Sequence, residues 1–459
     1  MSVDTNNAAF QDALNLIQYT RQSVFLTGKA GTGKSTFLRY VCENTKKKHV
    51  VLAPTGIAAI NAGGSTMHSF FKLPFYPLLP DDPNLSLQRG RIHEFFKYTK
   101  PHRKLLEQIE LVIIDEISMV RADIIDAIDR ILRVYSHNLR EPFGGKQLLL
   151  VGDVFQLEPV VKNDEREILN RAYPTPYFFS ARVFSQIDLV SIELQKVYRQ
   201  TDSVFVSVLD HIRTNTAGAA DLQLLNTRYG SHIEESEADM YITLATRRDT
   251  VDSINEKKLA ELAGEPITFE GSIEGDFPES SLPTSQELVL KPGAQIIFIK
   301  NDFDRRWVNG TIGVIAGIDE EEETIYVITD DGKECDVKRE SWRNIRYRYN
   351  EKTKEIEEEV LGSFTQYPIR LAWAITVHKS QGLTFSRVVI DFTGGVFAGG
   401  QAYVALSRCT SLDGIQLKKP INRADIFVRP EIVNFAGRFN DRQAIDKALK
   451  QAQADVQYA

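Results

Sequence analysis

The sequence predicts an α/β fold in which parallel strands alternate with helices, and three stretches carry that prediction. Residues 28–35 read GKAGTGKS and match the phosphate-loop pattern G-x-x-x-x-G-K-[S/T] at every fixed position. The apolar runs at 24–26 and 36–41 provide the strand and the helix that such a loop connects. Residues 111–116 form an apolar strand ending in two carboxylates, and residues 147–151 form a further buried strand.

The loop's chemistry points to a bound nucleotide. Its glycines let successive backbone N–H groups surround phosphate oxygens, and the following helix adds partial positive charge. Lys34 is expected to reach the β and γ phosphates, and Ser35 to hold Mg²⁺. ATP and Mg²⁺ are therefore the predicted cofactors. The residues expected to contact the nucleotide are Gly28, Ala30, Gly31, Thr32, Gly33, Lys34, Ser35, Thr36 and, from the second half of the chain, Gly382.

An amphipathic segment, residues 9–21, precedes the phosphate loop and places Phe10, Leu14 and Ile17 on one helical face. Gln11 lies within it. Its side-chain amide can donate and accept at once, which suits the edge of an adenine. The alternative interpretation of Gln11 is a solvated side chain.

The carboxylates that end the strand 111–114 predict hydrolytic chemistry. Asp115 is expected to coordinate Mg²⁺ together with Ser35, and Glu116 to polarise the attacking water. Gln156, in the loop after the strand 147–151, is a candidate sensor of the γ phosphate. An ordinary polar loop residue is the alternative for Gln156.

Residues 54–71 follow the predicted strand 49–53, and ligands bind at the carboxyl ends of parallel strands. Thr55, Gly56 and His68 offer donors to a nucleic-acid phosphate, and Phe70 and Phe71 offer faces on which bases can stack. Alternatively, the two phenylalanines belong to the core and the histidine takes no part.

Residues 72–102 break the regular pattern with several prolines, followed by a basic stretch. Residues 89–104 contain six Lys or Arg, one Glu and three Phe or Tyr. This interleaving suits an element that guides or separates strands, although a solvated basic helix explains the charges equally well.

Charge and composition narrow the class of protein. The formal net charge of −7 excludes a surface coated uniformly in basic residues, yet it allows a local basic groove. The three cysteines are widely separated, which predicts reduced thiols. With neither a signal segment nor an apolar run long enough for a membrane span, the expected location is the cytoplasm, associated with the nucleoid in a bacterium.

The second half of the chain predicts another parallel sheet with an insertion. Strand 241–245 opens this sheet, and Arg247 follows it as a candidate DNA contact. Residues 264–360 change to short alternating strands and turns, typical of a small antiparallel barrel, with the acidic run 319–323 at an exposed hairpin tip. Arg343, Arg346 and Arg348 either follow nucleic acid or decorate that barrel.

A polar segment after strand 367–374 offers a second grip on nucleic acid. His378, Lys379 and Ser380 present donors at a predicted helix start, which can hold a DNA phosphate. A nucleophilic role for Ser380 beside His378 is rejected because the G-x-S-x-G pattern is absent.

The motifs, taken together and in order, resemble those of superfamily-one helicases, and among these the Pif1 family of DNA helicases, relatives of RecD. The motifs are GKAGTGKST, APTGIAAINAGGSTMHSFF, IIDEISM, GDVFQLEPV, YRQ, AWAITVHKSQGLTF and YVALSRC. Residues 123–133 with PFGG at 142–145 resemble that family's own signature. By motif position, Arg199 and Arg408 look like the arginines that reach the γ phosphate across a cleft.

The resemblance implies an α/β fold of two RecA-like P-loop NTPase domains, the first with a small wedge insertion and the second with an inserted Src-homology-three-like β-barrel. The implied boundaries are 1–71 with 103–184 for the first domain, 72–102 for the wedge, 185–263 with 361–435 for the second domain, 264–360 for the barrel and 436–459 for a C-terminal helix. Unlike eukaryotic members, the chain has no long extension before the phosphate loop, so it is expected to be of the short bacterial type.

The activity implied by the resemblance is ATP-dependent, 5′-to-3′ unwinding of DNA by a monomer. The implied partners are single-stranded DNA and its junctions with duplex, including forks, DNA–RNA hybrids and quadruplexes, in repair, recombination and genome maintenance. Two other classes stay open: an RNA helicase of the same superfamily, and a nucleotide-gated remodelling ATPase that binds no nucleic acid.

Overall fold

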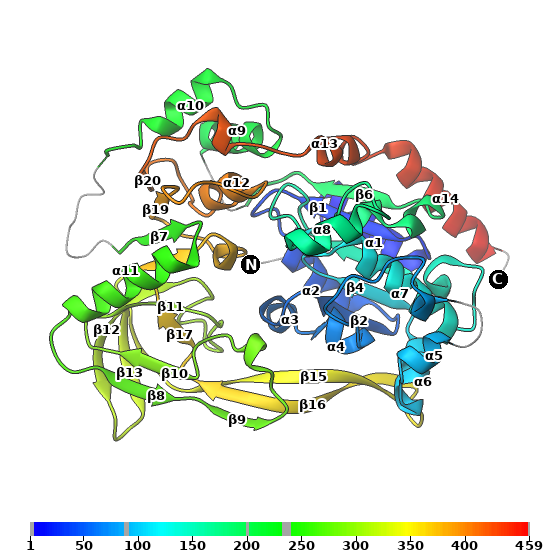
Figure 1. Cartoon of the computed structure of the whole chain (residues 1–459), viewed down its shortest axis with the longest axis horizontal. Helices are drawn as coiled ribbons and strands as arrows, with labels where there is room; N and C mark the ends of the chain where they lie inside the picture. Colours follow the sequence, from blue (N-terminus) through cyan, green and yellow to red (C-terminus); the bar gives the residue numbers. More distant parts are fainter. Residues whose placement is uncertain (1–3, 87–90, 199–201, 232–239, 458–459) are drawn as a thin grey trace.

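The computed structural model of the protein describes residues 4–86, 91–198, 202–231 and 240–457. Three bodies are visible in Figure 1: a first parallel sheet with its helices on the right, a second parallel sheet at the upper left, and antiparallel strands below it. The predicted α/β class with two parallel-sheet domains is confirmed. Within the described residues no helix is long and apolar enough to cross a membrane, and the three cysteines are free thiols, as predicted.

The first sheet has six strands, all parallel, in the order β3-β2-β4-β5-β1-β6. Nearly every residue of these strands is buried, which explains why they appear in the sequence as continuous apolar runs. The strands are β1 (Val24–Gly28), β2 (His49–Ala53), β3 (Ser65–Thr66), β4 (Leu111–Ile114), β5 (Gln147–Val151) and β6 (Val190–Leu194).

Helices cover both faces of this sheet and enclose two separate cores. One core joins α1 and the sheet through Phe10, Leu14 and Ile17, the face predicted from periodicity. The other contains the aromatic residues of the segment before β4. The helices of this domain are α1 (Ala8–Tyr19), α2 (Lys34–Asn44), α3 (Gly56–Ala62), α4 (Met67–Phe71), α5 (Arg91–Phe95), α6 (Lys100–Gln108), α7 (Ala122–Tyr135) and α8 (Asn163–Leu169).

Three buried aspartates of α7 explain the signature that begins at residue 123. Each carboxylate accepts a hydrogen bond from the backbone N–H of a different loop, so one helix anchors three segments that would otherwise bury unpaired donors. The pairs are Asp123 with Leu78 (3.1 Å), Asp126 with Val183 (3.0 Å) and Asp129 with Phe143 (2.6 Å).

The second sheet has four parallel strands in the order β18-β7-β19-β20. They are β7 (Ile242–Ala245), β18 (Ala374–Thr376), β19 (Val388–Asp391) and β20 (Ile415–Leu417), accompanied by α9 (Ser203–Arg213), α10 (Ala219–Asn226), α11 (Arg248–Glu261) and α12 (Gln401–Leu406). The chain then returns to the first domain through α13 (Pro430–Ala436) and α14 (Arg442–Gln457), as Figure 1 shows. Ile432 already packs in the first domain's core, although it falls in the span predicted for the second domain.

The insertion between β7 and β18 is antiparallel, as predicted. Its five-stranded sheet has the order β14-β13-β12-β11-β17, and its strands continue to Leu371, past the predicted boundary at 360. They are β11 (Gln295–Phe298), β12 (Ile312–Asp319), β13 (Thr324–Thr329), β14 (Glu334–Val337) and β17 (Ile369–Leu371), with a smaller pair β8 (Ile267–Glu270) and β10 (Glu287–Leu290).

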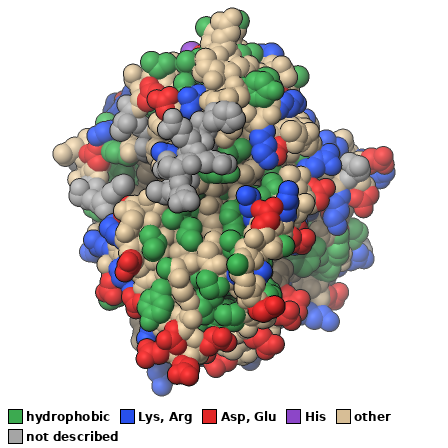
Figure 2. All heavy atoms as spheres, turned by 90° about the vertical axis from the view of Figure 1, so that its left-hand side faces the viewer, with side chains coloured by type: hydrophobic (Ala, Val, Ile, Leu, Met, Phe, Trp, Pro, Cys, Tyr) green, Lys and Arg blue, Asp and Glu red, His purple; other side chains and the backbone are tan. Residues whose placement is uncertain are grey.

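The acidic residues 320–323 are exposed at the turn between β12 and β13, as predicted. Figure 2 views the molecule from the side of this insertion, where acidic side chains gather along the lower edge and apolar ones lie above them. An acidic edge repels phosphates.

A long hairpin, β15 (Glu340–Asn350) and β16 (Glu355–Gln366), crosses from the insertion to the first domain (Figure 1). Ile345, Tyr347 and Tyr349 are buried in the first domain's core, and the Tyr347 hydroxyl accepts a hydrogen bond from the N–H of Val51 (3.3 Å). Arg346 and Arg348 alternate with the two tyrosines and are exposed, as a period of two requires. Arg343 is also exposed and lies beyond a β-bulge between Asn344 and Ile345. One face of the hairpin is therefore an interdomain contact.

Candidate nucleotide and nucleic-acid site

The phosphate loop joins β1 to α2 and takes a shape that needs glycine. Gly33 caps α2 with a φ of 91°, in the left-handed region. At Gly28 a Cβ atom would lie 2.7 Å from the carbonyl oxygen of Leu194. Larger residues at either position would distort the loop that the motif predicts.

Lys34 begins α2, and its ammonium group lies over this loop. Its Nζ donates to the carbonyl oxygens of Gly28 (2.7 Å) and Lys29 (3.0 Å). The Thr32 hydroxyl also donates to the Lys29 carbonyl (2.9 Å). The cation is thus held at the mouth of the loop, where a nucleotide phosphate would compete for it.

A cleft of about 520 Å³ lies above the loop, between the two parallel-sheet domains. It brings together most of the residues predicted to handle the nucleotide. Its lining includes Ala30, Gly31, Thr32, Gly33, Lys34, Ser35, Thr36, Asp115, Glu116, Gln156, Gly382 and Arg408.

Gln11 is not among the residues that line this cleft. Its side-chain amide instead donates to the carbonyl of Thr5 (2.7 Å). Asn7 and Phe10, which the sequence reasoning did not select for binding, face the cleft from the same region. The sequence predicts that Phe10 is a core residue, and no pattern in it indicates that Phe10 also lies at the edge of the cleft.

The paired carboxylates follow β4 and stand at the floor of the cleft. Asp115 Oδ1 accepts a hydrogen bond from the N–H of Glu116 (2.9 Å), and Glu116 takes a left-handed φ of 51°, a strained geometry often found at functional sites. Burial raises the pKa of both carboxyl groups, and the charge of Asp115 raises the pKa of Glu116 further, while Lys34 acts in the opposite direction on both.

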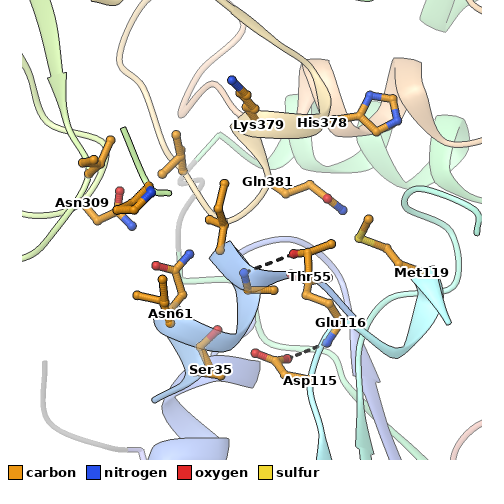
Figure 3. A pocket seen from close by; sticks show the side chains of 18 of the residues that line it. Ser35, Thr55, Asn61, Asp115, Glu116, Met119, Asn309, His378, Lys379 and Gln381 are labelled. Carbon is orange, nitrogen blue, oxygen red and sulfur yellow. Dashed lines mark hydrogen bonds between the residues drawn. The ribbon is translucent and has the colours of Figure 1, made fainter. Parts of the chain in front are cut away.

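The site fits a magnesium ion that a nucleotide shares. In Figure 3 Ser35 and Asp115 lie beside each other, and a hydroxyl and a carboxylate are the hard oxygen donors that Mg²⁺ prefers. The described residues contain no group of three or more His, Cys, Asp or Glu able to hold a metal.

Gln156 and Arg408 connect the nucleotide cleft to the second domain. The side-chain Nε2 of Gln381 donates a hydrogen bond to the side-chain Oε1 of Gln156 (3.5 Å). Arg408 is 1% exposed, and its Nη1 donates to the carbonyls of Ser380 (3.2 Å) and Leu383 (3.3 Å). Arg408 therefore lines the cleft and also supports the 378–383 loop. Arg199, the other predicted arginine, lies outside the described residues.

Three contacts between the domains were not predicted, because their partners are far apart in the chain and no motif specifies these pairings. Arg213 of α9 is buried between Asp153 (3.1 Å) and Glu193 (2.8 Å). Tyr403 of α12 accepts a hydrogen bond from Ala30 N–H (3.0 Å). Lys29 forms an ion pair with Asp210. The second domain thus touches the phosphate loop directly.

A second cleft of about 410 Å³ adjoins the first and shares Ser35, Asp115, Glu116 and Gly382 with it. Figure 3 looks into it. Thr55 faces it from the first domain, at the N-cap of α3, where its hydroxyl accepts a hydrogen bond from Ala58 N–H (3.2 Å). His378 and Lys379 face it from the second domain. The structure therefore brings together predicted nucleic-acid contacts from both halves of the chain.

The stacking role predicted for Phe70 and Phe71 is wrong. They are 3% and 0% exposed and pack in the first domain's core, because one turn of α4 directs both rings inward. The phosphate contact predicted for Ser380 is also wrong, since its buried hydroxyl donates to the Val377 carbonyl (2.7 Å). Gly56 is covered by the insertion: a Cβ there would lie 2.8 Å from the Cα of Ser281.

His68 and Arg247 are not among the residues that line this second cleft. His68 stacks on Phe75 with ring centroids 5.0 Å apart, and Phe75 is 81% exposed. The Nε of Arg247 donates to the carbonyl of Gly394 (3.0 Å). In the wedge segment, Phe96 and Tyr98 are buried and Phe95 is half-buried, whereas Phe75 and Tyr76 of the proline-rich part are exposed.

Two parallel-sheet domains that meet over one phosphate loop, with a second cleft for another ligand at the same junction, define a nucleoside triphosphatase of the helicase type. The chain belongs to the PIF1-like helicase family, whose family model matches residues 4–217. The predicted resemblance is therefore confirmed.

Individual relatives agree with this assignment. The ATP-dependent DNA helicase Pif1 of Campylobacter jejuni is 33% identical over 412 residues, 86% of this chain and 88% of that protein. The crystal structure of Bacteroides sp Pif1 with ADP-AlF4 is 41% identical, covers 95% of this chain and 97% of that chain, and has a TM-score of 0.86. Bacteroides Pif1 bound to ssDNA has the same identity and coverage with a TM-score of 0.66.

Proposed function

We propose that this protein is an ATP-dependent DNA helicase that moves 5′ to 3′ along single-stranded DNA. The observation that carries the proposal is the pair of adjoining clefts with Ser35, Asp115 and Glu116 common to both. A change of ligand in one cleft therefore acts on residues that also line the other cleft. The relatives' activity as ATP-dependent DNA helicases and the ssDNA complex of Bacteroides Pif1 support DNA as the second ligand.

Hydrolysis uses groups already placed around the phosphate loop. Lys34 exchanges its carbonyl partners for phosphate oxygens, and Glu116 accepts the proton of the attacking water. Ser35 and Asp115 would hold Mg²⁺, which would supply positive charge to the phosphates. Arg408 adds positive charge from the second domain, so that the two domains must be closed for the reaction to proceed.

Arg408 also couples the reaction to the DNA grip. In the structure it donates to carbonyls of the loop that carries His378 and Lys379. When Arg408 turns to the γ phosphate, these hydrogen bonds are released, and when the phosphate departs they form again. The loop therefore loses and regains its hydrogen bonds to Arg408 once in each ATP cycle. This change moves His378 and Lys379 relative to Thr55 on the other domain.

The remaining features of the function extend this proposal. We infer that the protein acts as a monomer in the cytoplasm and unwinds forks, duplexes with single-stranded tails, DNA–RNA hybrids and quadruplexes during repair and recombination. Melting one base-pair step costs about 1.4 kcal/mol, which ATP hydrolysis far from equilibrium can supply. Contacts to phosphates predict little preference for sequence.

The test is ATP-driven separation of one labelled duplex that carries either a 5′ or a 3′ single-stranded tail. We expect unwinding from the 5′ tail only, with Lys34→Ala as the inactive control. Unwinding from the 3′ tail would overturn the direction. Equal stimulation of ATP hydrolysis by RNA and DNA strands would favour an RNA helicase, and stimulation by neither would favour a remodelling ATPase.

A further inference from the structure

A half-buried arginine that no motif selects lines the second cleft. Arg370 lies in β17, the strand of the insertion from which the chain passes directly into β18 of the second sheet. It faces the same cleft as Thr55, His378 and Lys379. A guanidinium group at this position stands between the insertion and both parallel-sheet domains.

The contacts of Arg370 leave its charge without a counter-charge. Its Nη2 donates to the carbonyl of Pro283, and its Nε is fully covered and has no hydrogen-bond partner. Among the described residues no carboxylate forms an ion pair with it. Burial alone lowers the pKa of Arg370 to about 10, with no acidic neighbour to offset the effect. A desolvated cation is costly unless an anion accompanies it.

Further polar and positive groups line the cleft beside apolar ones, and Asp115 and Glu116 line it where it adjoins the nucleotide cleft. Burial lowers the pKa of His378, and burial together with the charge of Arg370 lowers the pKa of Lys379. Asn61 and Asn309 add side-chain amides to the lining. The cleft therefore offers several donors to an anion with several oxygens.

We propose that Arg370 is a phosphate-binding residue of the single-strand path, contributed by the insertion and acting together with Thr55 and Lys379. The proposal deepens the DNA-helicase function and rests on it. The anion is a phosphodiester of the strand and not a nucleotide phosphate, because Arg370 is absent from the lining of the cleft above the phosphate loop.

The experiment measures binding of a fluorescein-labelled oligothymidylate to the full chain across a salt series, for wild type, Arg370→Gln, Arg370→Lys and Arg438→Gln. Glutamine keeps a donor for Pro283 but removes the charge. Arg438 is an exposed arginine near α13 and serves as the matched control. We expect Arg370→Gln to weaken binding about tenfold and to reduce the slope of log K against log salt by about 0.7.

Arg370→Lys should keep the wild-type slope, and Arg438→Gln should change neither quantity. The Michaelis constant for ATP without DNA should stay unchanged in all variants. A lowered melting temperature of Arg370→Gln with an unchanged salt slope would overturn the proposal in favour of a structural role. A raised Michaelis constant for ATP would overturn it in favour of a nucleotide contact. If wild type binds no oligothymidylate, the proposed function itself fails.

Discussion

The hydroxyl of Tyr403 accepts a hydrogen bond from the backbone N–H of Ala30 at 3.0 Å. This bond links α12 of the second domain to the phosphate loop of the first. Tyr403 is 3% exposed, and burial raises the pKa of its hydroxyl, so the group stays neutral. A residue of the second domain thus accepts a hydrogen bond from one of the backbone N–H groups with which the phosphate loop can bind phosphate.

Tyr403→Phe should tighten nucleotide binding. The change leaves the Ala30 N–H without an acceptor, which costs about 1–3 kcal/mol, whereas a phosphate oxygen would satisfy it. We expect about a tenfold lower dissociation constant for a non-hydrolysable ATP analogue, measured by calorimetry. Weaker binding would mean that the hydroxyl contacts the nucleotide directly.

Lys34→Ala should abolish hydrolysis and leave DNA binding. Loss of one cation that stabilises the transition state lowers turnover by about 10²–10³, and Lys34 is not among the residues that line the second cleft. ATP turnover and oligothymidylate affinity are measured side by side, with the exposed Lys46→Ala as control. Normal turnover in Lys34→Ala would contradict the site.

The pH dependence of hydrolysis should report Glu116. Burial and Asp115 raise the pKa of Glu116 to about 7. The carboxylate accepts a proton only when it is ionised, so turnover should rise with pH through neutrality and fall on the acidic side. In Glu116→Gln we expect bound ATP, very slow turnover and no such rise. A rate independent of pH in wild type would argue against Glu116 as the base.

Arg213→Ala should destabilise the protein strongly. The side chain is 3% exposed between Asp153 and Glu193, and its removal leaves two carboxylates without their cation. Breaking such a buried pair costs about 3–5 kcal/mol, which urea unfolding measures. Arg346→Ala, which breaks an exposed pair with Glu359, should cost at most about 1 kcal/mol. Equal losses in the two variants would contradict the assigned burial.

Phe70 and Phe75 should behave in opposite ways. Phe70→Ala removes a buried ring and should cost about 3–5 kcal/mol of unfolding free energy. Phe75→Ala removes an exposed ring stacked on His68, so we expect unchanged stability and weaker single-strand affinity. Unchanged affinity in Phe75→Ala would exclude a stacking platform at this surface.

The sequence was most informative where chemistry and spacing are local. The phosphate loop, the Asp115 and Glu116 pair and the buried strands could be predicted because each depends on neighbours within a few residues. The predictions failed for Phe70, Phe71 and Ser380, since orientation toward the core or the cleft is not encoded in residue type. A polar or aromatic side chain can pack in the core or line the cleft equally well.

Contacts between residues far apart in the chain could not be predicted from the sequence, for a related reason. Arg213 and Arg370 match no motif, and the motif that contains Tyr403 does not specify its partner. Their roles appear only when segments far apart in the chain meet. The same holds for the hairpin β15–β16: the sequence indicated a basic cluster on the inserted barrel, but only the packed structure decided that Tyr347 lies against the first domain.

The sequence by itself therefore determined the family, the two parallel sheets and the residues around the nucleotide, because backbone geometry and phosphate chemistry restrict residue types at fixed spacing. The tertiary structure decided which donors share a cleft, which arginine is left without a counter-charge and how the second domain touches the phosphate loop. Those properties depend on desolvation and on distances between groups, and both arise only when the chain is folded.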